Sequence, residues 1–386
     1  MLAVITDDFT GASEIAGVAL AKGYRTVIET RPVRRPDADV IVIATDMRSL
    51  AAADAANLSA KLTEQILALK PDFIFKKVDS VLRGNIGPEL EAQIHIERKS
   101  AALLVPANPS RKRTIANGIY YVDNMPVAES GFSQNRSAFP SSSRVIDILE
   151  SRGASMVTCV SLDDSLKAPG VLVGNAASNE DLSAWATHID DRLVPAGAAD
   201  FFAAILDCRP APQRINGAQV STAIGTRTLY LCGSNYPSSR EAVAIAGNHG
   251  TSIVGMPDEI YYGDKVNSDA VRVWARNVES ALFKGHTVVV AALQIQQGDC
   301  LSGRQITAAM AEVAGYVVRR NAVDELMIEG GATSQAVMDT LQIDHLYPSD
   351  AVAPGVTRMR VDNYPDLHIT MKPGSYRWPD KIWNAK

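Results

Sequence analysis

Residues 2–12 of the chain read LAVITDDFTGA and combine a short apolar run, two adjacent aspartates and a glycine. The run Leu2 to Thr6 has the length and the β-branched content of a buried strand. The next segment, Ala12–Lys22, has apolar residues at helical spacing and ends at Gly23, which predicts a helix. The chain therefore begins with a strand and a helix, joined by a turn that carries two carboxylates.

The same alternation of strand and helix continues along the chain. In the first half we expect strands at Thr26–Ile28, Val40–Ala44, Phe73–Phe75 and Ala101–Val105, and helices at Leu50–Leu69 and Glu89–Glu97. In the second half we expect strands at Leu229–Cys232, Ser252–Gly255, Val288–Leu293, Glu325–Ile328, Met359–Val361 and His368–Met371, and helices at Ser239–Ala246, Ala270–Phe283, Gly303–Arg319 and Thr333–Leu341. Near-continuous apolar strands of this kind predict parallel sheets covered by helices on both faces.

This pattern predicts an α/β protein of two domains, each a mainly parallel sheet flanked by helices, with the active site in the cleft between them. We place the first domain at residues 1–208, a hinge rich in proline and glycine at 209–227, and the second domain at 228–386. Residues 107–143 are rich in Asn, Ser, Pro and Gly, and we interpret them as a long functional loop or lid.

Composition narrows the class of protein. The 386 residues are 46% hydrophobic and 21% charged, a globular balance that excludes a disordered or fibrous chain. With 38 Lys and Arg against 43 Asp and Glu, the net charge of −5 leaves no basic field for DNA or RNA. Four isolated cysteines are expected to be free thiols rather than zinc ligands or disulfides. Without a basic leader or an apolar run of about 20 residues, we expect a soluble cytoplasmic protein.

Charged and hydroxyl side chains follow three strands of the first domain. The first strand ends at Asp7-Asp8, the third leads to Arg48, and the fourth runs into the segment 76–80, Lys-Lys-Val-Asp-Ser, with Arg83 close behind. Since the carboxyl ends of parallel strands open into one crevice, we expect these groups to converge and to suit a small polyhydroxylated acid. Each piece also has a structural reading: a helix cap for Asp7-Asp8, a surface ion pair for Lys77 and Asp79, and a solvated side chain for Arg48.

The second domain offers glycine turns at strand ends. Gly233-Ser234 follows one predicted strand, Gly330-Gly331-Ala332-Thr333 follows another, and Lys372-Pro373-Gly374 closes a third. Glycines let a phosphate approach the unpaired N–H groups at a helix N-terminus, although tight turns without a ligand use them too. Neither a P-loop nor a G-x-G-x-x-G motif occurs. The basic segment 111–113 is either a solvated charge run or a loop that faces the phosphate-transfer site.

Taken together, these motifs resemble the four-carbon acid sugar kinase family. The resemblance rests on Ile5–Ala12 and Lys77–Asn85, and continues through Val105–Ala107, Gly118–Tyr120, Gly233-Ser234, Gly330–Ser334, Pro354–Val356 and Lys372–Gly374. It implies an ATP-dependent phosphotransferase that phosphorylates the terminal hydroxyl of a four-carbon sugar acid. The tail resembles the D-threonate kinase branch most. The alternatives are a D-erythronate or 3-oxo-tetronate kinase and, in another class, a non-catalytic sugar-acid sensor.

The resemblance also implies site residues. The acid is expected to contact Asp8, Arg48, Lys77, Val78, Asp79, Ser80 and Arg83, and the nucleotide Ser234, Gly330, Gly331, Ala332, Thr333 and Gly374. Asp8 or Asp79 is the expected base or orienting carboxylate, with the cations anchoring the acid. The expected cofactors are ATP and the Mg²⁺ that it carries, with no metal site of the protein's own. The expected partners are a small sugar acid and ATP, with no nucleic acid and no membrane, and a homodimer is left open. Ala332 stands where the family commonly has an acidic residue, which favours the sensor alternative.

Overall fold

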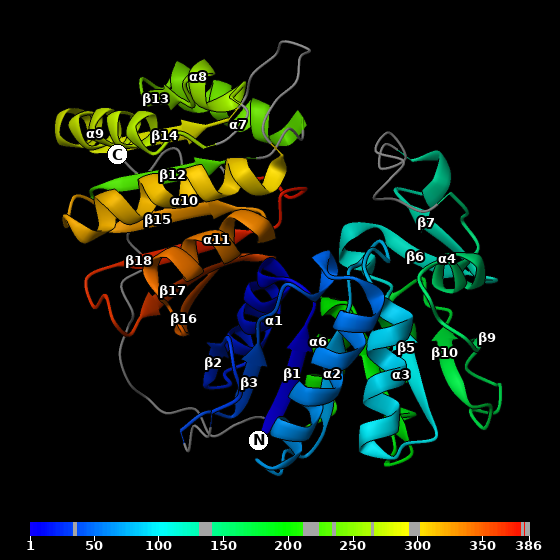
Figure 1. The fold of residues 1–386 in the computed structure, drawn as a ribbon. Helices are drawn as coiled ribbons and strands as arrows, with labels where there is room; N and C mark the ends of the chain where they lie inside the picture. The colour runs from blue at the N-terminus through cyan, green and yellow to red at the C-terminus, as the bar shows by residue number, and fades with distance from the viewer. Residues whose placement is uncertain are drawn as a thin grey trace. The chain divides into compact units, whose positions relative to one another are not determined.

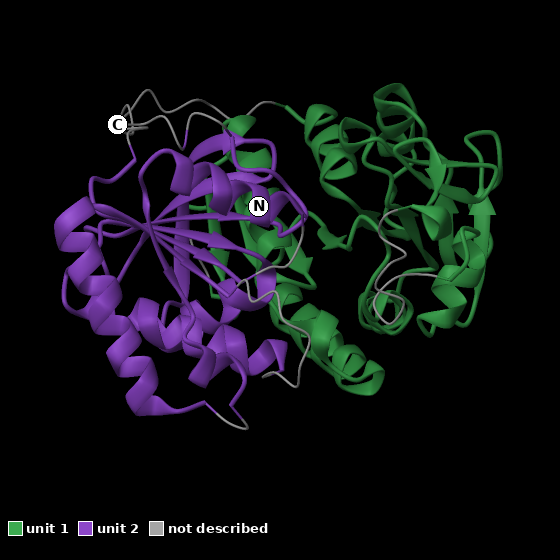
Figure 2. Ribbon diagram, turned by 90° about the horizontal axis from the view of Figure 1, so that it is seen from above, with its two compact units in different colours: residues 1–215 green, residues 216–386 purple. Residues whose placement is uncertain are grey.

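The computed structural model describes residues 1–33, 37–130, 141–210, 224–233, 237–263, 266–292, 302–379 and 382. The chain divides into two compact units, residues 1–215 and 216–386 (Figure 2). Each unit contains a mainly parallel sheet flanked by helices, so the predicted α/β class is confirmed (Figure 1). Most of the predicted hinge, 209–227, lies outside the described residues, and the domain limits at 208 and 228 stay a prediction.

The sheet of the first unit has the strand order β2-β3-β1-β4-β11-β5-β10-β9, and all of its strands are parallel. Its central strands are fully buried because their runs of Val, Ile, Leu and Ala pack against helices on both faces. The strands are β1 (Leu2–Thr6), β2 (Thr26–Glu29), β3 (Val40–Ile43), β4 (Ile74–Lys77), β5 (Ala101–Val105), β9 (Val157–Val160), β10 (Gly170–Gly174) and β11 (Leu193–Gly197).

Two groups of helices cover this sheet. Helices α2 and α3 pack side by side (Figure 1), and α1 packs against α6, which contacts α5. The helices are α1 (Phe9–Ala21), α2 (Ala52–Leu67), α3 (Ile86–Glu97), α4 (Val145–Ser151), α5 (Asn179–Thr187) and α6 (Ala199–Asp207). The side chain of Asp8 caps α1, and Ser178 with Asp181 forms a capping box for α5.

The centre of the sheet contains a topological switch point between β1 and β4. From β1 the chain continues through α1 toward β2 and β3, whereas from β4 it continues through α3 toward β5 on the other side. Ligands of open α/β sheets bind beside such points, outside the carboxyl ends of the strands. The segments that follow β1 and β4 are therefore the places to look for a site.

The predicted loop or lid at 107–143 is wrong in part, because a small antiparallel sheet of three strands lies there. Two-residue turns join its strands, with Asn117-Gly118 in one and Asp123-Asn124 in the other, all at positive φ. This is the geometry of type I′ hairpins. The short segments are η2 (Pro109–Arg111), β6 (Arg113–Ala116), β7 (Ile119–Val122), β8 (Met125–Pro126) and η3 (Val127–Glu129). Residues 131–140 lie outside the described part.

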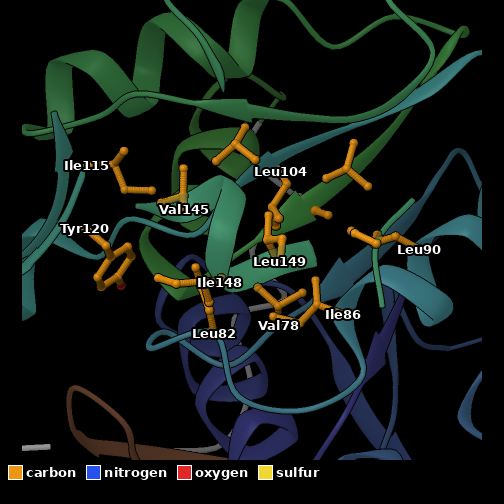
Figure 3. Close-up of a cluster of buried hydrophobic side chains, with 14 of the residues drawn as sticks. Val78, Leu82, Ile86, Leu90, Leu104, Ile115, Tyr120, Val145, Ile148 and Leu149 are labelled. Carbon is orange, nitrogen blue, oxygen red and sulfur yellow. The ribbon is translucent and has the colours of Figure 1, made fainter. Parts of the chain in front are cut away.

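A buried hydrophobic cluster joins this small sheet to the large one (Figure 3). Ile115 and Tyr120 of the small sheet pack in the same cluster as Val78 and Leu82, which follow β4. Burial of such side chains stabilises the fold by about 1.5–3 kcal/mol each. The turn after β4 thus rests on a packed core rather than on solvent.

The sheet of the second unit has the order β13-β14-β12-β15-β18-β17-β16. Its first five strands are parallel, and β17 is antiparallel to both of its neighbours. The strands are β12 (Thr228–Cys232), β13 (Ser252–Gly255), β14 (Thr287–Ala291), β15 (Glu325–Glu329), β16 (His345–Ala353), β17 (Val356–Val361) and β18 (His368–Lys372).

The second unit has its own switch point, between β12 and β15. From β12 the chain passes through α7 toward the β13 edge, and from β15 it passes through α11 toward the opposite edge. Helices α10 and α11 pack side by side, and α9 contacts α10 (Figure 1). The helices are α7 (Pro237–Asn248), α8 (Asp258–Tyr261), α9 (Ser268–Gly285), α10 (Gly303–Arg319) and α11 (Gly331–Leu341). Within the described residues, no helix combines the length and the apolarity that crossing a membrane requires.

Candidate active site

Arg48 lies at the centre of a charged cluster at the carboxyl ends of the strands in the first unit. Its Nε and Nη2 donate to the two oxygens of Asp7, at 2.8 Å each, and its Nη1 donates to Oδ2 of Asp8 at 2.9 Å. The 3₁₀ turn η1 (Met47–Ser49) presents the guanidinium from beyond β3. Burial disfavours the charged form, but the carboxylates around Arg48 raise its pKa well above the usual value. The predicted convergence of Arg48 with the turn after β1 is thus present in the structure.

Asp8 is both a helix cap and a member of this cluster. Its Oδ1 accepts from the N–H of Gly11 at 2.8 Å, and its Oδ2 accepts from the Thr10 hydroxyl at 2.8 Å. Burial opposes ionisation, but Arg48 and Lys77 hold the pKa of Asp8 below its usual value. The carboxylate is therefore charged at neutral pH, and its function as a helix cap is compatible with the predicted role in binding or catalysis.

Asp79 pairs with Arg83 in a two-pronged contact. Nε and Nη2 of Arg83 donate to Oδ2 and Oδ1 of Asp79, each at 2.7 Å, and Nη2 of Arg48 lies 3.6 Å from Oδ1. The backbone N–H groups of Val81 and Arg83 also donate to Oδ2. Burial disfavours the anion, yet Arg83 and Arg48 bring the pKa of Asp79 well below its usual value.

Lys77 and Lys76 lie on opposite faces of β4, as the alternation of a strand requires. Nζ of Lys77 lies 3.4 Å from Oε2 of Glu14 and donates to the carbonyl oxygen of Val78 at 2.9 Å. Lys76 forms a separate buried pair with Glu89 at 2.5 Å. Lys77 therefore belongs to the charged cluster, and Lys76 does not.

Ser80 connects the charged cluster to the small antiparallel sheet. Its hydroxyl accepts from Nη1 of Arg113, and its carbonyl oxygen accepts from the hydroxyl of Tyr120. Of the basic segment 111–113, Arg113 is thus buried beside the predicted site rather than solvated. The side chain of Val78 packs in the hydrophobic cluster, and its N–H donates to the carbonyl of Gly197. The predicted ligand contact of Val78 stays a prediction, and its carbonyl oxygen accepts from Nζ of Lys77.

Exposure separates the groups that a ligand can touch from those that support them. The side chains of Arg83, Arg48 and Asp8 are 28%, 20% and 12% exposed, whereas that of Asp7 is 3% exposed. Asp7 therefore orients Arg48 from the buried side of the guanidinium group. A small polar molecule would meet the edges of two guanidinium groups and one carboxylate. That set can bind a carboxylate and hydroxyl groups at the same time.

In the second unit, the glycine turn after β15 starts helix α11. Gly330 has a φ of +90°, and a Cβ placed on it would meet no atom of the described residues within 4 Å. Within the described part of the chain no side chain caps the helix, and the N–H groups of Gly331, Ala332 and Thr333 lack intrahelical acceptors because they belong to its first turn. Such an N-terminus is suited to phosphate.

Two other predicted nucleotide segments lie beside this turn. A Cβ on Gly233 would lie 3.3 Å from Oγ1 of Thr333, so the end of β12 lies against the start of α11. The N–H of Gly330 donates to the carbonyl of Lys372 at 3.0 Å, which places the segment leading to Gly374 beside the same turn. Ser234 lies outside the described residues. Among the residues that the structure describes, no group of three or more His, Cys, Asp or Glu side chains is arranged to hold a metal ion.

Comparison with known proteins identifies the family. Residues 2–205 match the model of a sugar-binding N-terminal domain, and residues 229–376 match that of a nucleotide-binding C-terminal domain. The chain belongs to the four-carbon acid sugar kinase family. The resemblance of its motifs to this family is thereby confirmed, and the protein is a phosphotransferase with an alcohol group as acceptor.

Members of this kinase family match the chain at low identity, two of them over most of its length and one over about half of it. The 3-oxo-tetronate kinase of Methylobacterium radiotolerans is 27% identical over 421 residues, covering 100% of this chain and 98% of that protein. The D-threonate kinase of Bordetella bronchiseptica is 24% identical over 380 residues, covering 92% of this chain and 88% of that protein. The D-threonate kinase of Salmonella typhimurium is 32% identical over 197 residues, 47% of this chain and 46% of that protein.

Two solved structures have the same fold as this kinase. A Salmonella typhimurium protein gives a TM-score of 0.80 at 20% identity and covers 100% of this chain and 98% of its own. A Haemophilus influenzae protein gives 0.71 at 19% identity, with 99% and 98% covered. At these identities the likeness establishes the fold alone.

Three residues that contact the charged cluster or its supporting turn were not predicted as site residues from the sequence. Asp7 was seen only as the neighbour of Asp8, although it is the main partner of Arg48. Glu14 is the one charged residue of α1, and that isolation was a usable signal. Tyr120 is named only within the resemblance segment Gly118–Tyr120, and its bond to Ser80 depends on a hairpin that was not predicted.

Proposed function

We propose that the protein transfers the terminal phosphate of ATP to the terminal hydroxyl of a four-carbon sugar acid, with D-threonate converted to 4-phospho-D-threonate as the first choice. The observation that carries this proposal is the convergence of Asp8, Arg48, Lys77 and Asp79 at the strand ends of a unit that matches a sugar-binding domain. Phosphoryl transfer needs charge neutralisation, positioning and a group that orients the attacking hydroxyl. The cluster contains groups for each of these tasks.

Asp8 is the better candidate to accept the hydroxyl proton. A carboxylate oxygen has about two lone-pair sites. Oδ1 of Asp8 accepts one hydrogen bond, from Gly11, whereas Oδ2 of Asp79 accepts three and its Oδ1 faces two guanidinium groups. Asp8 thus has capacity for one more donor. Its lowered pKa makes it a weak base, which suffices where the transition state is loose.

The guanidinium groups would bind the carboxylate of the acid. Three of the five N–H donors of Arg48 point at Asp7 and Asp8, so donors remain at its exposed edge. Arg83 presents a second edge with its carboxylate partner already in place. Because both cations are fixed by carboxylates before a ligand arrives, little side-chain entropy is lost on binding.

The second unit would bind ATP. The N–H groups of Gly331, Ala332 and Thr333 would contact phosphate oxygens, and among the described residues no atom lies within 4 Å of a Cβ placed on Gly330 that would keep them out. Gly374 is proposed as a further backbone contact, because its segment lies beside the same turn. Mg²⁺, bound by the nucleotide's phosphates and water, would supply charge neutralisation.

A specific observation supports a second substrate. The 3-oxo-tetronate kinase of Methylobacterium radiotolerans matches over 100% of this chain, at higher identity than the D-threonate kinase of Bordetella bronchiseptica. A 3-oxo-tetronate is therefore the runner-up, followed by D-erythronate. A sensor without catalysis is the alternative in another class, and it would bind a sugar acid without consuming ATP.

One assay separates these possibilities. The purified protein is given ATP, Mg²⁺ and each four-carbon acid in turn, and ADP release is measured together with the melting temperature. The proposal predicts turnover with D-threonate. The ³¹P NMR spectrum of the product should show that the phosphate is attached to C4. Turnover with a 3-oxo-tetronate alone would reassign the substrate. Melting shifts without ADP release from any acid would reject the kinase proposal in favour of the sensor.

A further inference from the structure

Three residues form a row across neighbouring strands of the second unit. Cys232 is in register with Glu329, and Glu329 is in register with Lys372, each at the carboxyl end of its strand. Each is followed at once by a proposed nucleotide segment: Gly233, Gly330 and Pro373-Gly374. The row therefore lies directly beneath all three segments.

The row contains a buried ion pair. Nζ of Lys372 lies 3.0 Å from Oε2 of Glu329, and the two side chains are 1% and 0% exposed. The hydroxyl of Ser239, on α7, donates to Oε1 of Glu329, and the Lys372 ammonium lies 5.2 Å from the centroid of the Trp378 ring. Burial lowers the pKa of Lys372 although Glu329 opposes the shift, and burial and Glu329 raise the pKa of the Cys232 thiol. The thiol is thus neutral, and the ion pair of Glu329 and Lys372 lies beside it.

A buried ion pair is weak evidence for stability, since desolvation of its charges offsets much of their attraction. This pair has a second connection to the glycine turn. The N–H of Gly330 donates to the carbonyl of Lys372, so a backbone bond links the same two strand ends that the side chains link. Gly330, at positive φ, precedes the first residue of α11. The side chain of Lys372, the last residue of β18, holds the end of β18 against the end of β15. Side chains and backbone together hold the start of α11.

We propose that Glu329 and Lys372 are positioning residues for the nucleotide, which hold the turns after β12, β15 and β18 in the arrangement that binds its phosphates. The inference rests on the proposed function of the second unit. Both side chains are buried and would not touch the nucleotide, so the effect of the pair on binding would pass through the turn at Gly330. Loss of the pair would loosen the phosphate contacts and leave sugar-acid binding unchanged.

The same strand provides a matched control. Glu325, at the amino end of β15, is also 0% exposed and pairs with a buried cation, since Nη2 of Arg358 lies 2.8 Å from its Oε2. Thr370 donates to its Oε1 at 2.8 Å, as Ser239 does to Glu329. Both glutamates are fully buried, and each contacts one cation and one hydroxyl, but Glu325 also accepts from Nε of Arg358 and from the N–H of Gly225. Only the pair of Glu329 adjoins the glycine turns.

The experiment compares Glu329→Gln with Glu325→Gln in the full chain. Calorimetric titration with ATP in the absence of a sugar acid measures nucleotide binding, and steady-state kinetics measures both KM values. Glu329→Gln should raise the Kd and the KM for ATP at least tenfold, with the KM for the acid within twofold. Glu325→Gln should keep the Kd and the KM for ATP within twofold, even where it lowers the melting temperature as much. Equal effects of the two variants on the ATP Kd would overturn the inference.

A milder variant keeps the test decisive if Glu329→Gln does not fold. Ser239→Ala removes the hydroxyl that donates to Glu329 and leaves the ion pair in place. It should raise the Kd for ATP two- to fivefold, and an unchanged Kd would reject the positioning role. Because ATP binding is measured without an acid, a wild-type protein that phosphorylates no acid would reject the proposed function separately from this inference.

Discussion

The N–H group of Gly11 donates to Oδ1 of Asp8, and a methyl group on the Cα of Gly11 would lie 2.7 Å from that same oxygen. The missing side chain therefore allows the carboxylate to lie this close to the helix turn. Nζ of Lys77 lies on the same side, 3.6 Å from where that methyl group would be. A glycine in this helix turn thus controls the position of the proposed base.

Gly11→Ala should reduce kcat about 10- to 100-fold, because the added methyl group displaces or covers Oδ1 of Asp8. Alanine in a helix is favoured over glycine by about 0.5–1 kcal/mol, but the shifted Asp8 cap costs a similar amount, so the melting temperature should change little. Kinetics and a melting curve of the same sample check both points. Full activity in this variant would mean that Oδ1 does not face the substrate.

Asp8→Asn should lower kcat by about 10²-fold or more with a smaller change in KM, because the lost interaction is strongest in the transition state. Asparagine is nearly as good a helix cap as aspartate, so the fold should persist. Arg48 would also keep its two bonds to Asp7. An unchanged kcat in the folded variant would remove Asp8 from the mechanism and transfer the role to Asp79.

Arg48→Ala should affect stability as well as binding, unlike the loss of a surface cation. Removing one partner of a buried pair costs about 3–5 kcal/mol, and here Asp7 would lose two charge-assisted bonds. We expect a melting temperature lower by roughly 10 °C and a KM for the acid raised about tenfold or more. Arg83→Ala is the comparison, since Arg83 is more exposed and should change KM with less loss of stability. Equal melting temperatures for Arg48→Ala and the wild type would show that Asp7 does not depend on Arg48 as a buried partner.

The lowered pKa of Asp79 predicts the pH dependence of stability. A carboxyl group whose pKa is depressed by folding stabilises the protein above its unfolded pKa, about 3.9, and loses that contribution as pH falls through the folded value. The urea midpoint should therefore fall as the pH is lowered below about 4. Asp79→Asn should make this fall in the urea midpoint shallower, because an asparagine side chain takes up no proton when the protein unfolds at low pH. A slope identical to that of the wild type would contradict the shift.

Much of the fold could be predicted because buried strands of a parallel sheet are continuous apolar runs. Leu2 to Thr6 was predicted with its observed bounds, and so was the helix Gly303–Arg319. The strand His345–Ala353 was not predicted, because Pro348 and polar neighbours interrupt it and its pairing contains bulges.

The site could be predicted only as far as strand ends allow. Parallel strands bring their ends together, so the meeting of Asp8 with Arg48 followed from the fold class. Which carboxylate takes which donor depends on side-chain packing, and the pairing of Arg48 with Asp7 could not be read from spacing. The small sheet was a different case. Asn117-Gly118 between apolar residues is a strong hairpin signal, and the polar composition of residues 107–143 concealed it.

That hairpin has a consequence for how the site opens. Arg113 and Tyr120 both donate to Ser80, and Tyr120 packs in one cluster with Leu82 (Figure 3). Local opening of the hairpin would remove two donors from the turn at residues 79–84, so the two segments share one free energy of opening. Amide hydrogen exchange in β6 and β7 should then slow when a sugar acid binds at Asp79. The backbone of a strand some forty residues along the chain would report occupancy of the site.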